Sequence, residues 1–245
     1  MGATRGLGGT AWIFGGTSTV GVAIARALAR RGVRLVLVAR RADDLTATAM
    51  DLHLRFGATV QGVVLDAEDP AYMARLEQAL ADDPGKVAGL VWAWGIMGRE
   101  DDRSAQYIDR LLRVNTWACM ATTEAFLSRL DPEGFVALIG SVAGDRGRAV
   151  NYLYGASKAA LVTFAEGLRQ RLAGTGPRVL LVKLGRVRSR MTEGMSGTAD
   201  PDTVAERIVR ALQGRAGRIY VPARWGLLMA VLRALPEPVW LRLRV

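Results

Sequence analysis

The amino-acid sequence predicts a single Rossmann-like α/β domain: a doubly wound parallel sheet of about seven strands with helices on both faces. Short apolar runs alternate with longer helix-patterned segments along the whole chain. That alternation is typical of βαβ units, whose parallel strands are covered by helices on both faces. A chain of 245 residues without a Pro/Gly/Ser-rich linker is long enough for one such domain.

The expected elements follow from the spacing of apolar residues. Strands are expected at residues 11–15, 34–39, 59–65, 90–94, 135–139, 178–184 and 218–221. Helices are expected at residues 20–31, 43–56, 72–81, 105–130, 152–173 and 201–212. Several helices end at a glycine, which takes the left-handed cap conformation most easily: Gly32, Gly57, Gly174 and Gly214. We therefore expect a catalytic domain over residues 1–223 and an apolar, basic C-terminal tail over residues 224–245.

The formal net charge of +10 favours anionic partners. The positive charge is spread along the chain, and no basic run is interleaved with base-stacking aromatic residues, so we expect no nucleic-acid binding. Cofactor phosphates, an anionic substrate or a membrane surface are better candidates for the partner.

The cysteine, histidine and apolar content indicates the cellular compartment and whether a metal site is expected. The single cysteine, Cys119, cannot form an internal disulfide and lies in an apolar helical context, which favours a buried thiol and a reducing cytoplasm. Residues 1–5 begin no signal peptide that we can identify, and no apolar run is long enough to span a membrane. No His/Cys cluster indicates a metal site, and His53, the only histidine, is expected to be structural.

A glycine-rich turn follows the first expected strand. Glycines at this point let the backbone turn sharply and approach a pyrophosphate, whose charge the next helix N-terminus stabilises. A plain strand-to-helix turn is the alternative, but the position after the first strand of a βαβ series favours a nucleotide. The expected contacts are Gly15, Thr17, Ser18, Thr19, Val20 and Gly21.

The end of the second strand favours NADP(H) over NAD(H). An acidic residue that would bind the ribose 2′-hydroxyl of NAD is replaced by Arg40 and Arg41, and a guanidinium suits a 2′-phosphate. The alternative is that both are ordinary surface arginines. After the third strand, Asp66 and Ala67 are expected beside the adenine, although Asp66 would also serve as a helix cap.

Tyr154 and Lys158 lie four residues apart at the start of a long helix, and therefore on one face of it. A free phenol ionises near pH 10, and a neighbouring ammonium together with a positively charged nicotinamide would lower that pKa. Ser141, after an apolar strand, would orient a substrate oxygen, and Asn115 would hold a water behind Lys158. Each residue alone has an ordinary structural explanation, whereas their joint occurrence on the appropriate elements indicates a catalytic site.

These motifs resemble the short-chain dehydrogenase/reductase family over nearly the whole chain. The resemblance implies a catalytic tetrad at Asn115, Ser141, Tyr154 and Lys158, with Tyr154 and Lys158 also contacting the cofactor. The family's strand-four Asn-Asn-Ala-Gly falls on residues 92–95, and its Pro-Gly after strand six falls on residues 184–185. The further cofactor contacts implied are Ala93, Gly95, Gly185, Val187 and Ser189.

Three departures place the chain in a divergent branch: Thr19 replaces the middle glycine, neither strand-four asparagine is kept, and Leu184 replaces the proline. The branch resembles the reductase component of decaprenylphosphoryl-ribose 2-epimerase, which implies a keto sugar on a polyprenyl phosphate. The alternatives are a reductase of a soluble ketone and a nucleotide-binding regulator without turnover. The resemblance also implies a homodimer or homotetramer built on the helices at residues 105–130 and 152–173.

Two arginine-rich loops and the tail bear on the substrate. Arg146 and Arg148, and later Arg186, Arg188 and Arg190, would meet an anionic substrate, or equally the cofactor phosphate or solvent. The tail carries tryptophans and leucines among Arg224, Arg233, Arg242 and Arg244, so it would pack on the domain, on a partner subunit or on lipid. A cytoplasmic protein with peripheral contact at the inner face of the membrane is consistent with the lipid alternative.

Overall fold

The computed structural model describes residues 8–83, 85–98 and 102–243, so residues 1–5 and Arg244, which the sequence analysis considers, lie outside it. Within these ranges one seven-stranded parallel sheet forms, with the strand order β3-β2-β1-β4-β5-β6-β7. The doubly wound architecture expected from the sequence is confirmed. The strands are β1 (Thr10–Phe14), β2 (Arg34–Ala39), β3 (Val60–Val64), β4 (Val87–Trp92), β5 (Leu130–Ser141), β6 (Arg178–Leu184) and β7 (Arg218–Val221).

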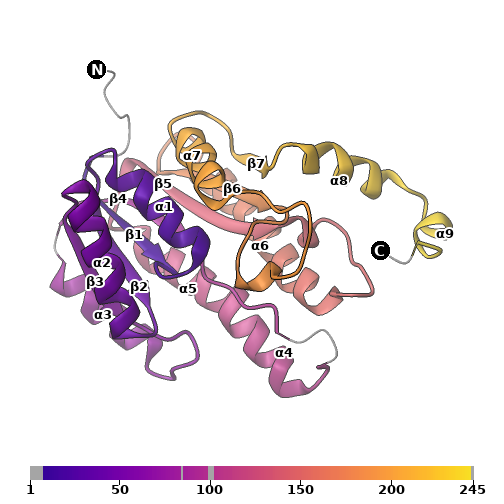
Figure 1. The fold of residues 1–245 in the computed structure, drawn as a ribbon, viewed down its shortest axis with the longest axis horizontal. Coiled ribbons are helices and arrows are strands. Elements are labelled where there is room, and N and C mark those ends of the chain that lie inside the picture. Colours follow the sequence, from indigo (N-terminus) through magenta and orange to yellow (C-terminus); the bar gives the residue numbers. More distant parts are fainter. Residues whose placement is uncertain (1–7, 84, 99–101, 244–245) are drawn as a thin grey trace.

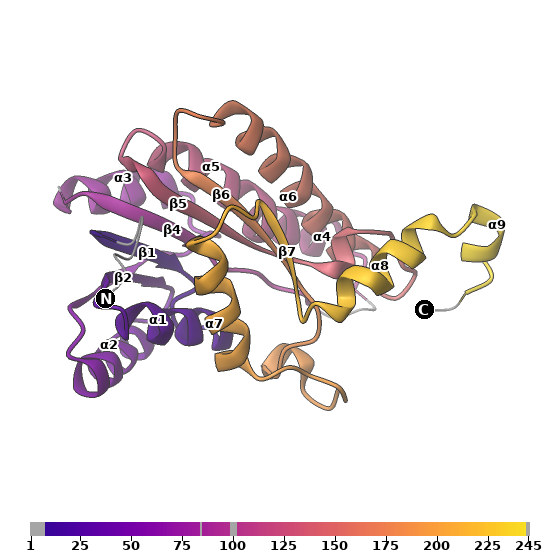
Figure 2. The same cartoon turned by 90° about the horizontal axis from the view of Figure 1, so that it is seen from above.

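Helices cover both faces of the sheet (Figures 1 and 2). One face packs against α1 (Thr19–Ala29), α2 (Ala42–Phe56) and α7 (Pro201–Leu212). The other packs against α3 (Tyr72–Asp82), α5 (Ala118–Phe126) and α6 (Tyr152–Arg171), with α4 (Ala105–Leu112) preceding α5. Beyond β7, α8 (Arg224–Ala234) and α9 (Glu237–Trp240) extend away from the sheet (Figure 2).

The core forms two layers because successive side chains of a strand point to opposite faces. In β1, Ala11 and Ile13 join the α1 side, whereas Trp12 and Phe14 join the α5 side. Trp92, which stands where the family has an asparagine, is fully buried with its ring centroid 5.2 Å from that of Phe14. Its indole is therefore part of the core, and the departure at this position is a packing feature.

The helix expected over residues 105–130 is wrong in two respects. A π-helical turn (Arg113–Trp117) separates α4 from α5, and α5 ends at Phe126. Leu130 belongs to β5, where it pairs with Val87 of β4. A π turn inserts one extra residue into the helical repeat and is frequent at functional sites, and here it contains Asn115.

One of the four expected glycine caps is the C-cap of its helix: Gly57 caps α2, whereas Arg30 caps α1 and Leu172 caps α6. Gly32, Gly57 and Gly174 have φ of 73°, 61° and 80°, in the left-handed region. Gly214 has no positive φ, because α7 ends through the right-handed Gln213 instead. Cys119 is fully buried, as expected.

Strand order reverses between β1 and β4, whose carboxyl ends therefore open a crevice at the sheet edge. Ligands of doubly wound sheets bind at such a switch point. We therefore expect the glycine turn, Ser141 and Tyr154 to form a ligand site at this edge of the sheet.

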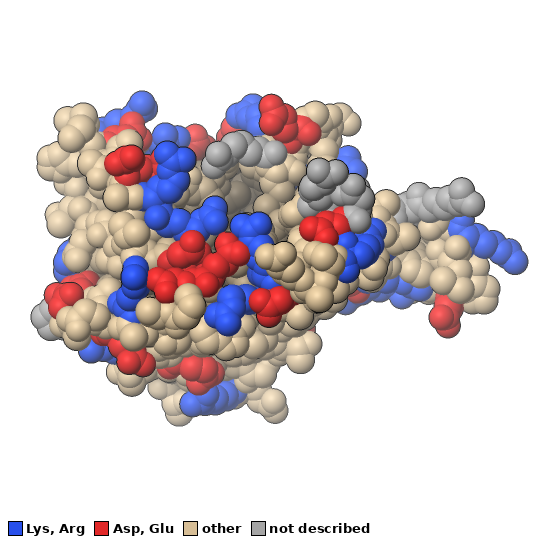
Figure 3. All heavy atoms as spheres, turned by 90° about the horizontal axis from the view of Figure 1, so that it is seen from below, with Lys and Arg blue, Asp and Glu red and all other residues tan. Residues whose placement is uncertain are grey.

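The surface charge is mixed on the face shown in Figure 3, where acidic side chains gather in the centre with basic ones around them. The excess of arginine therefore forms no single basic patch on that face. Among the described residues, no helix has the length and apolarity needed to cross a membrane.

Candidate active site

The turn after β1 is packed so closely that two of its glycines have no room for a side chain. Gly15 has φ +81°, and a Cβ there would lie 2.8 Å from the carbonyl oxygen of Ala93. A Cβ on Gly21 would lie 2.0 Å from the Gly15 carbonyl oxygen. Ser18 caps α1, since its Oγ accepts a hydrogen bond of 3.0 Å from the Gly21 amide. The turn thus holds the α1 N-terminus, with its partial positive charge, against the end of β4.

A cavity opens beside this turn on the β2 side. Arg40 enters it from the end of β2, with its guanidinium 3.7 Å from the Glu68 carboxylate. Asp66 accepts a hydrogen bond of 3.0 Å from the Glu68 amide and so shapes the adjoining loop. The lining residues are Gly15, Thr17, Ser18, Arg40, Asp66, Ala67, Glu68, Trp94, Gly95, Ile96 and Val114.

A second cavity continues from the first toward β5 and β6. The two share Ser18, Trp94 and Gly95, so together they form one elongated site across the carboxyl edge of the sheet. The second is lined by Ser18, Thr19, Val20, Ala93, Trp94, Gly95, Ile139, Gly140, Ser141, Tyr154, Lys158, Leu184, Gly185, Val187, Ser189, Met191 and Thr192. The joined cavities have the α1 N-terminus at the middle and Arg40 at one end, an arrangement that fits an extended dinucleotide.

Tyr154, Lys158 and Ser141 meet in the second cavity. Tyr154 and Lys158 lie one turn apart on α6, with the Lys158 Nζ 5.8 Å from the centre of the Tyr154 ring. Ser141 ends β5, and its Oγ accepts a hydrogen bond of 3.1 Å from the Ala143 amide. The Ser141 hydroxyl is near enough to the Tyr154 phenol to lower its pKa.

Burial sets the protonation of this pair. Desolvation raises the pKa of Tyr154, although the Ser141 hydroxyl and the charge of Arg148 act in the opposite direction. Desolvation also lowers the pKa of Lys158 to about 8. Near neutral pH the phenol is therefore protonated and the lysine is close to its titration point, which suits proton transfer.

Asn115 forms the wall behind Lys158. Its Oδ1 accepts a hydrogen bond of 2.8 Å from the Ile96 amide, and its Nδ2 donates to the Ile96 carbonyl at 2.9 Å and to Ser157 Oγ at 3.0 Å. A Cβ on Gly95 would lie 2.9 Å from Lys158 Nζ and 3.2 Å from Asn115 Oδ1. The π turn thus joins the loop after β4 to α6 and leaves Gly95 exposed to the cavity.

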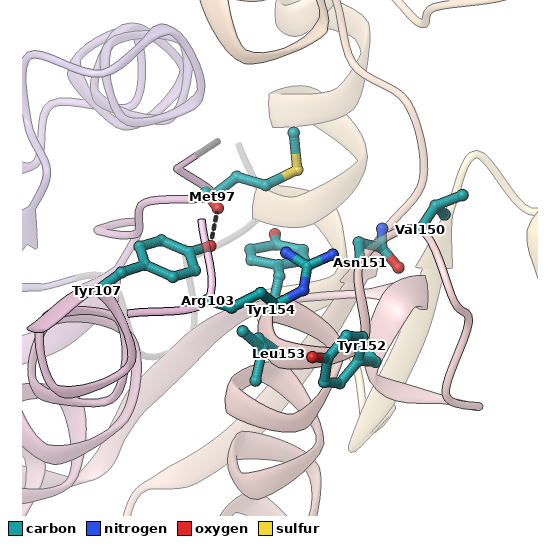
Figure 4. Close-up of a pocket in the computed structure, with 8 residues that line it drawn as sticks. All are labelled: Met97, Arg103, Tyr107, Val150, Asn151, Tyr152, Leu153 and Tyr154. Carbon is teal, nitrogen blue, oxygen red and sulfur yellow. Dashed lines mark hydrogen bonds between the residues drawn. The ribbon is translucent and has the colours of Figure 1, made fainter. Parts of the chain in front are cut away.

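A third, smaller cavity adjoins Tyr154 (Figure 4). Arg103, from the segment before α4, lies in front of Tyr154, and its guanidinium carbon is 5.2 Å from the centre of the Tyr152 ring. The Tyr107 hydroxyl donates to the Met97 carbonyl and closes one side. The remaining lining comes from the segment leading into α6: Val150, Asn151 and Leu153.

Comparison with known proteins identifies the family of this site. Residues 9–199 match the family model for short chain dehydrogenases. The chain belongs to the short-chain dehydrogenase/reductase family. An uncharacterized oxidoreductase of Mycobacterium tuberculosis is 36% identical over 240 residues, covering 94% of this chain and 95% of that protein.

Solved structures of short-chain dehydrogenases superpose on the chain. One from Sphingobium yanoikuyae, in complex with NADPH, has a TM-score of 0.73 and 27% identity and covers 93% of this chain and 96% of its own. The Pseudomonas aeruginosa RhlG/NADP active-site complex has a TM-score of 0.78 and 25% identity over 92% of this chain and 99% of its own. The chain is thus an oxidoreductase of this family with its fold intact.

Most of the residues singled out from the sequence meet in this site. Ser141, Tyr154 and Lys158 line the second cavity, and Asn115 lies directly behind Lys158. Most of the expected cofactor residues line one of the two joined cavities. Gly21 lines neither and acts on the turn's packing instead. Arg41 is exposed, lies outside the lining, and pairs with Asp44 at 3.4 Å.

The arginine loops are placed differently from the expectation of an anion site. Arg146 donates to carbonyl oxygens at the end of α8, and Arg188 pairs with Asp200 at 2.7 Å. Arg186 is exposed. None of these three lines the joined cavities.

Several lining residues are absent from the sequence-based selection. Trp94 and Ile96 flank Gly95, so the strand-four motif itself was a signal for them. Met191 and Thr192 follow Ser189 on a short 3-10 turn, and Thr192 Oγ1 donates to the Val187 carbonyl at 2.5 Å. Glu68 and Val114 come from loops and helices with no local motif, so only the fold brings them to the cavity.

Replacing Gly21 with alanine is expected to weaken NADPH binding more than tenfold and to destabilise the fold by about 1–3 kcal/mol, because the new Cβ overlaps the Gly15 carbonyl. NADPH titration and thermal unfolding measure both effects. The matched control is Gly214→Ala, where the nearest atom would be 3.5 Å away. Equal behaviour of the two variants would contradict the steric account of the turn.

Proposed function

We propose that the chain is an NADP(H)-dependent reductase that interconverts a ketone and a secondary alcohol. The observation that carries this proposal is the convergence of Ser141, Tyr154 and Lys158 at one end of an elongated cavity that has Arg40 at its other end. A nicotinamide bound between them would supply or accept the hydride. Binding it is the task of the glycine turn, the α1 N-terminus and the lining of the joined cavities.

Tyr154 is proposed to give its phenolic proton to the ketone oxygen as that oxygen gains charge. Burial keeps the phenol protonated until then, and Ser141 is near enough to orient the same oxygen. Lys158 is proposed to lower the free energy of the resulting phenolate through its positive charge. Asn115 is proposed to hold the Ile96 backbone and Ser157, and with them the position of Lys158. A water bound beside Asn115 would complete a proton path behind Lys158.

Replacing Tyr154 with phenylalanine is expected to reduce ketone turnover by about 10²–10⁴-fold, because the proton donor is lost and the ring remains. NADPH affinity is expected to stay within about twofold, since one hydroxyl among many contacts is removed. Tyr152→Phe is the control, because Tyr152 is an exposed neighbour on the same helix. Full reductase activity in Tyr154→Phe would overturn the proposed role.

The pH dependence of ketone reduction is expected to follow Lys158. The pKa of Lys158, lowered by burial to about 8, implies that the ammonium is present below pH 8 and lost above it. The kcat/KM for reduction should therefore be level below that pH and fall about tenfold per unit above it. A kcat/KM that rises between pH 7 and 9 would contradict the assignment.

A preference for NADP(H) over NAD(H) is proposed for Arg40, which lines the cavity at the end of β2. Its guanidinium suits a 2′-phosphate, and the structures from Sphingobium yanoikuyae and Pseudomonas aeruginosa carry NADPH and NADP. Arg40→Ala should weaken NADPH binding at least about tenfold and leave NADH binding unchanged. Arg41→Ala, which removes an arginine outside the lining, is the matched control. Equal affinities of the unaltered protein for the two cofactors would contradict the preference.

A second candidate is reduction of a ketone carried on a polyprenyl phosphate, at the inner face of the membrane. The observation in its favour is α8 and α9, where Leu227 and Leu241 are 76% and 74% exposed. Arg224, Arg233 and Arg242 accompany these apolar residues, a combination that binds anionic lipid surfaces. A homodimer or homotetramer through the helices at residues 105–130 and 152–173 remains part of either proposal.

Vesicle sedimentation distinguishes a lipid-linked substrate from a soluble ketone. The full chain should bind vesicles of anionic phospholipid, and Leu241→Glu should weaken that binding about tenfold because it places a negative charge in the apolar surface. Vesicles of zwitterionic lipid serve as the control. Equal, weak binding by both proteins would favour the soluble substrate.

A further inference from the structure

The C-terminal arm, defined as α8 and α9, extends from the body of the molecule but is fastened to it at the active-site edge (Figure 1). The fastening points are on the loop after β5, which leads from Ser141 to Tyr154, and on the loop after β6. These two loops border the cavity that holds Tyr154 and Lys158. The arm therefore contacts both loops that border the active-site cavity.

Arg146, on the first of these loops, makes the contact with the C-terminal arm. Its Nη1 donates to the carbonyl oxygens of Leu235 at 2.9 Å and Arg233 at 3.2 Å, and also to that of Leu232. Carbonyls at a helix C-terminus have no partner within the helix, so one guanidinium satisfies the end of α8. The same guanidinium lies over the Trp240 ring, 4.4 Å from its centre, and thereby holds α9 as well.

The neighbouring residue anchors Arg146 to the sheet. The Asp145 carboxylate pairs with Lys183 of β6 and accepts a hydrogen bond of 2.9 Å from the Tyr220 hydroxyl of β7. The Asp145 and Lys183 side chains are 0% and 2% exposed, so this pair is buried. A buried ion pair resists displacement, since separating it leaves charge without solvent. Arg146 thus projects from a fixed point four residues after Ser141.

The start of the arm contacts the second loop. A Cβ on Gly185 would lie 1.9 Å from Trp225 Nε1, so the indole occupies the space that any larger residue would need. Arg224 donates to the Gly197 carbonyl at 2.8 Å. Both ends of α8 are therefore tied to the loops that frame the cavity, one at Gly185 and one at Arg146.

We infer that Arg146 is a positioning residue, which holds the C-terminal arm against the loop at residues 142–151 and thereby fixes Ser141 and Tyr154 relative to the substrate. The inference rests on the proposed reductase function for its kinetic consequence. Its structural consequence does not depend on turnover: with Arg146 replaced, the loop and the arm both lose a shared constraint.

Hydrogen exchange of the full chain tests the structural consequence. The amides of Ala143, Asp145 and Asn151 are hydrogen bonded within the loop, so their exchange reports its opening. Arg146→Ala should accelerate exchange about tenfold or more both in this loop and in the arm, since three hydrogen bonds and the ring contact are lost. Arg215→Ala, which removes an exposed arginine between α7 and β7, should change neither segment. Acceleration confined to the arm would overturn the inference.

Kinetics with a ketone substrate test the catalytic consequence. Arg146→Ala should raise KM and lower kcat, each by several-fold, while NADPH affinity stays within about twofold because Arg146 lines neither joined cavity. Arg146→Lys, which keeps the charge without the planar fork, should lie between the two. If Arg146→Ala does not fold, Trp240→Leu removes only the ring contact and should shift exchange and KM in the same direction. Unchanged KM and kcat in a variant whose loop exchanges faster would refute the positioning role. If the unaltered chain reduces no ketone, the proposed function is refuted, and the exchange result still stands.

Discussion

The side-chain amide of Asn115 is the contact on which the site depends. It makes hydrogen bonds to both backbone groups of Ile96 and to Ser157, and so joins three elements: the loop after β4, the π turn and α6. A buried amide is costly unless all its polar atoms are paired, and here each is paired within the protein. Rotation of α6 against β4 would break these bonds. Asn115 thus links the loop that carries Gly95 to the helix that carries Tyr154 and Lys158.

Desolvation converts that placement into chemistry. Lys158 and Tyr154 are withdrawn from solvent, and desolvation disfavours the ionised form of each. The phenol consequently keeps its proton and the pKa of the ammonium falls toward neutrality. Burial alone moves the pKa of Tyr154 away from neutral pH, so the positive charge of Lys158 beside the ring is needed to stabilise the phenolate as the proton leaves.

The sequence was sufficient for the sheet, for most helices and for Ser141, Tyr154 and Lys158 at its carboxyl edge, because alternation and four-residue spacing are local patterns that the fold preserves. The π turn was not predictable, since the partners of its Asn115, Ile96 and Ser157, lie far away in the sequence. The same holds for Arg146: its partners lie almost 90 residues away, so an anion site and a helix cap looked alike in the sequence. Trp92 is the opposite case, because its role in the core follows from strand alternation alone.

Isotope transfer tests the central claim most directly. NADPH carrying deuterium at C4 of the nicotinamide is incubated with the protein and a panel of ketones, and the alcohol product is examined by mass spectrometry and NMR. The account predicts oxidation of NADPH and deuterium on the carbinol carbon of at least one product. Tight binding of NADPH without oxidation across the panel would contradict it and would favour a nucleotide-binding regulator.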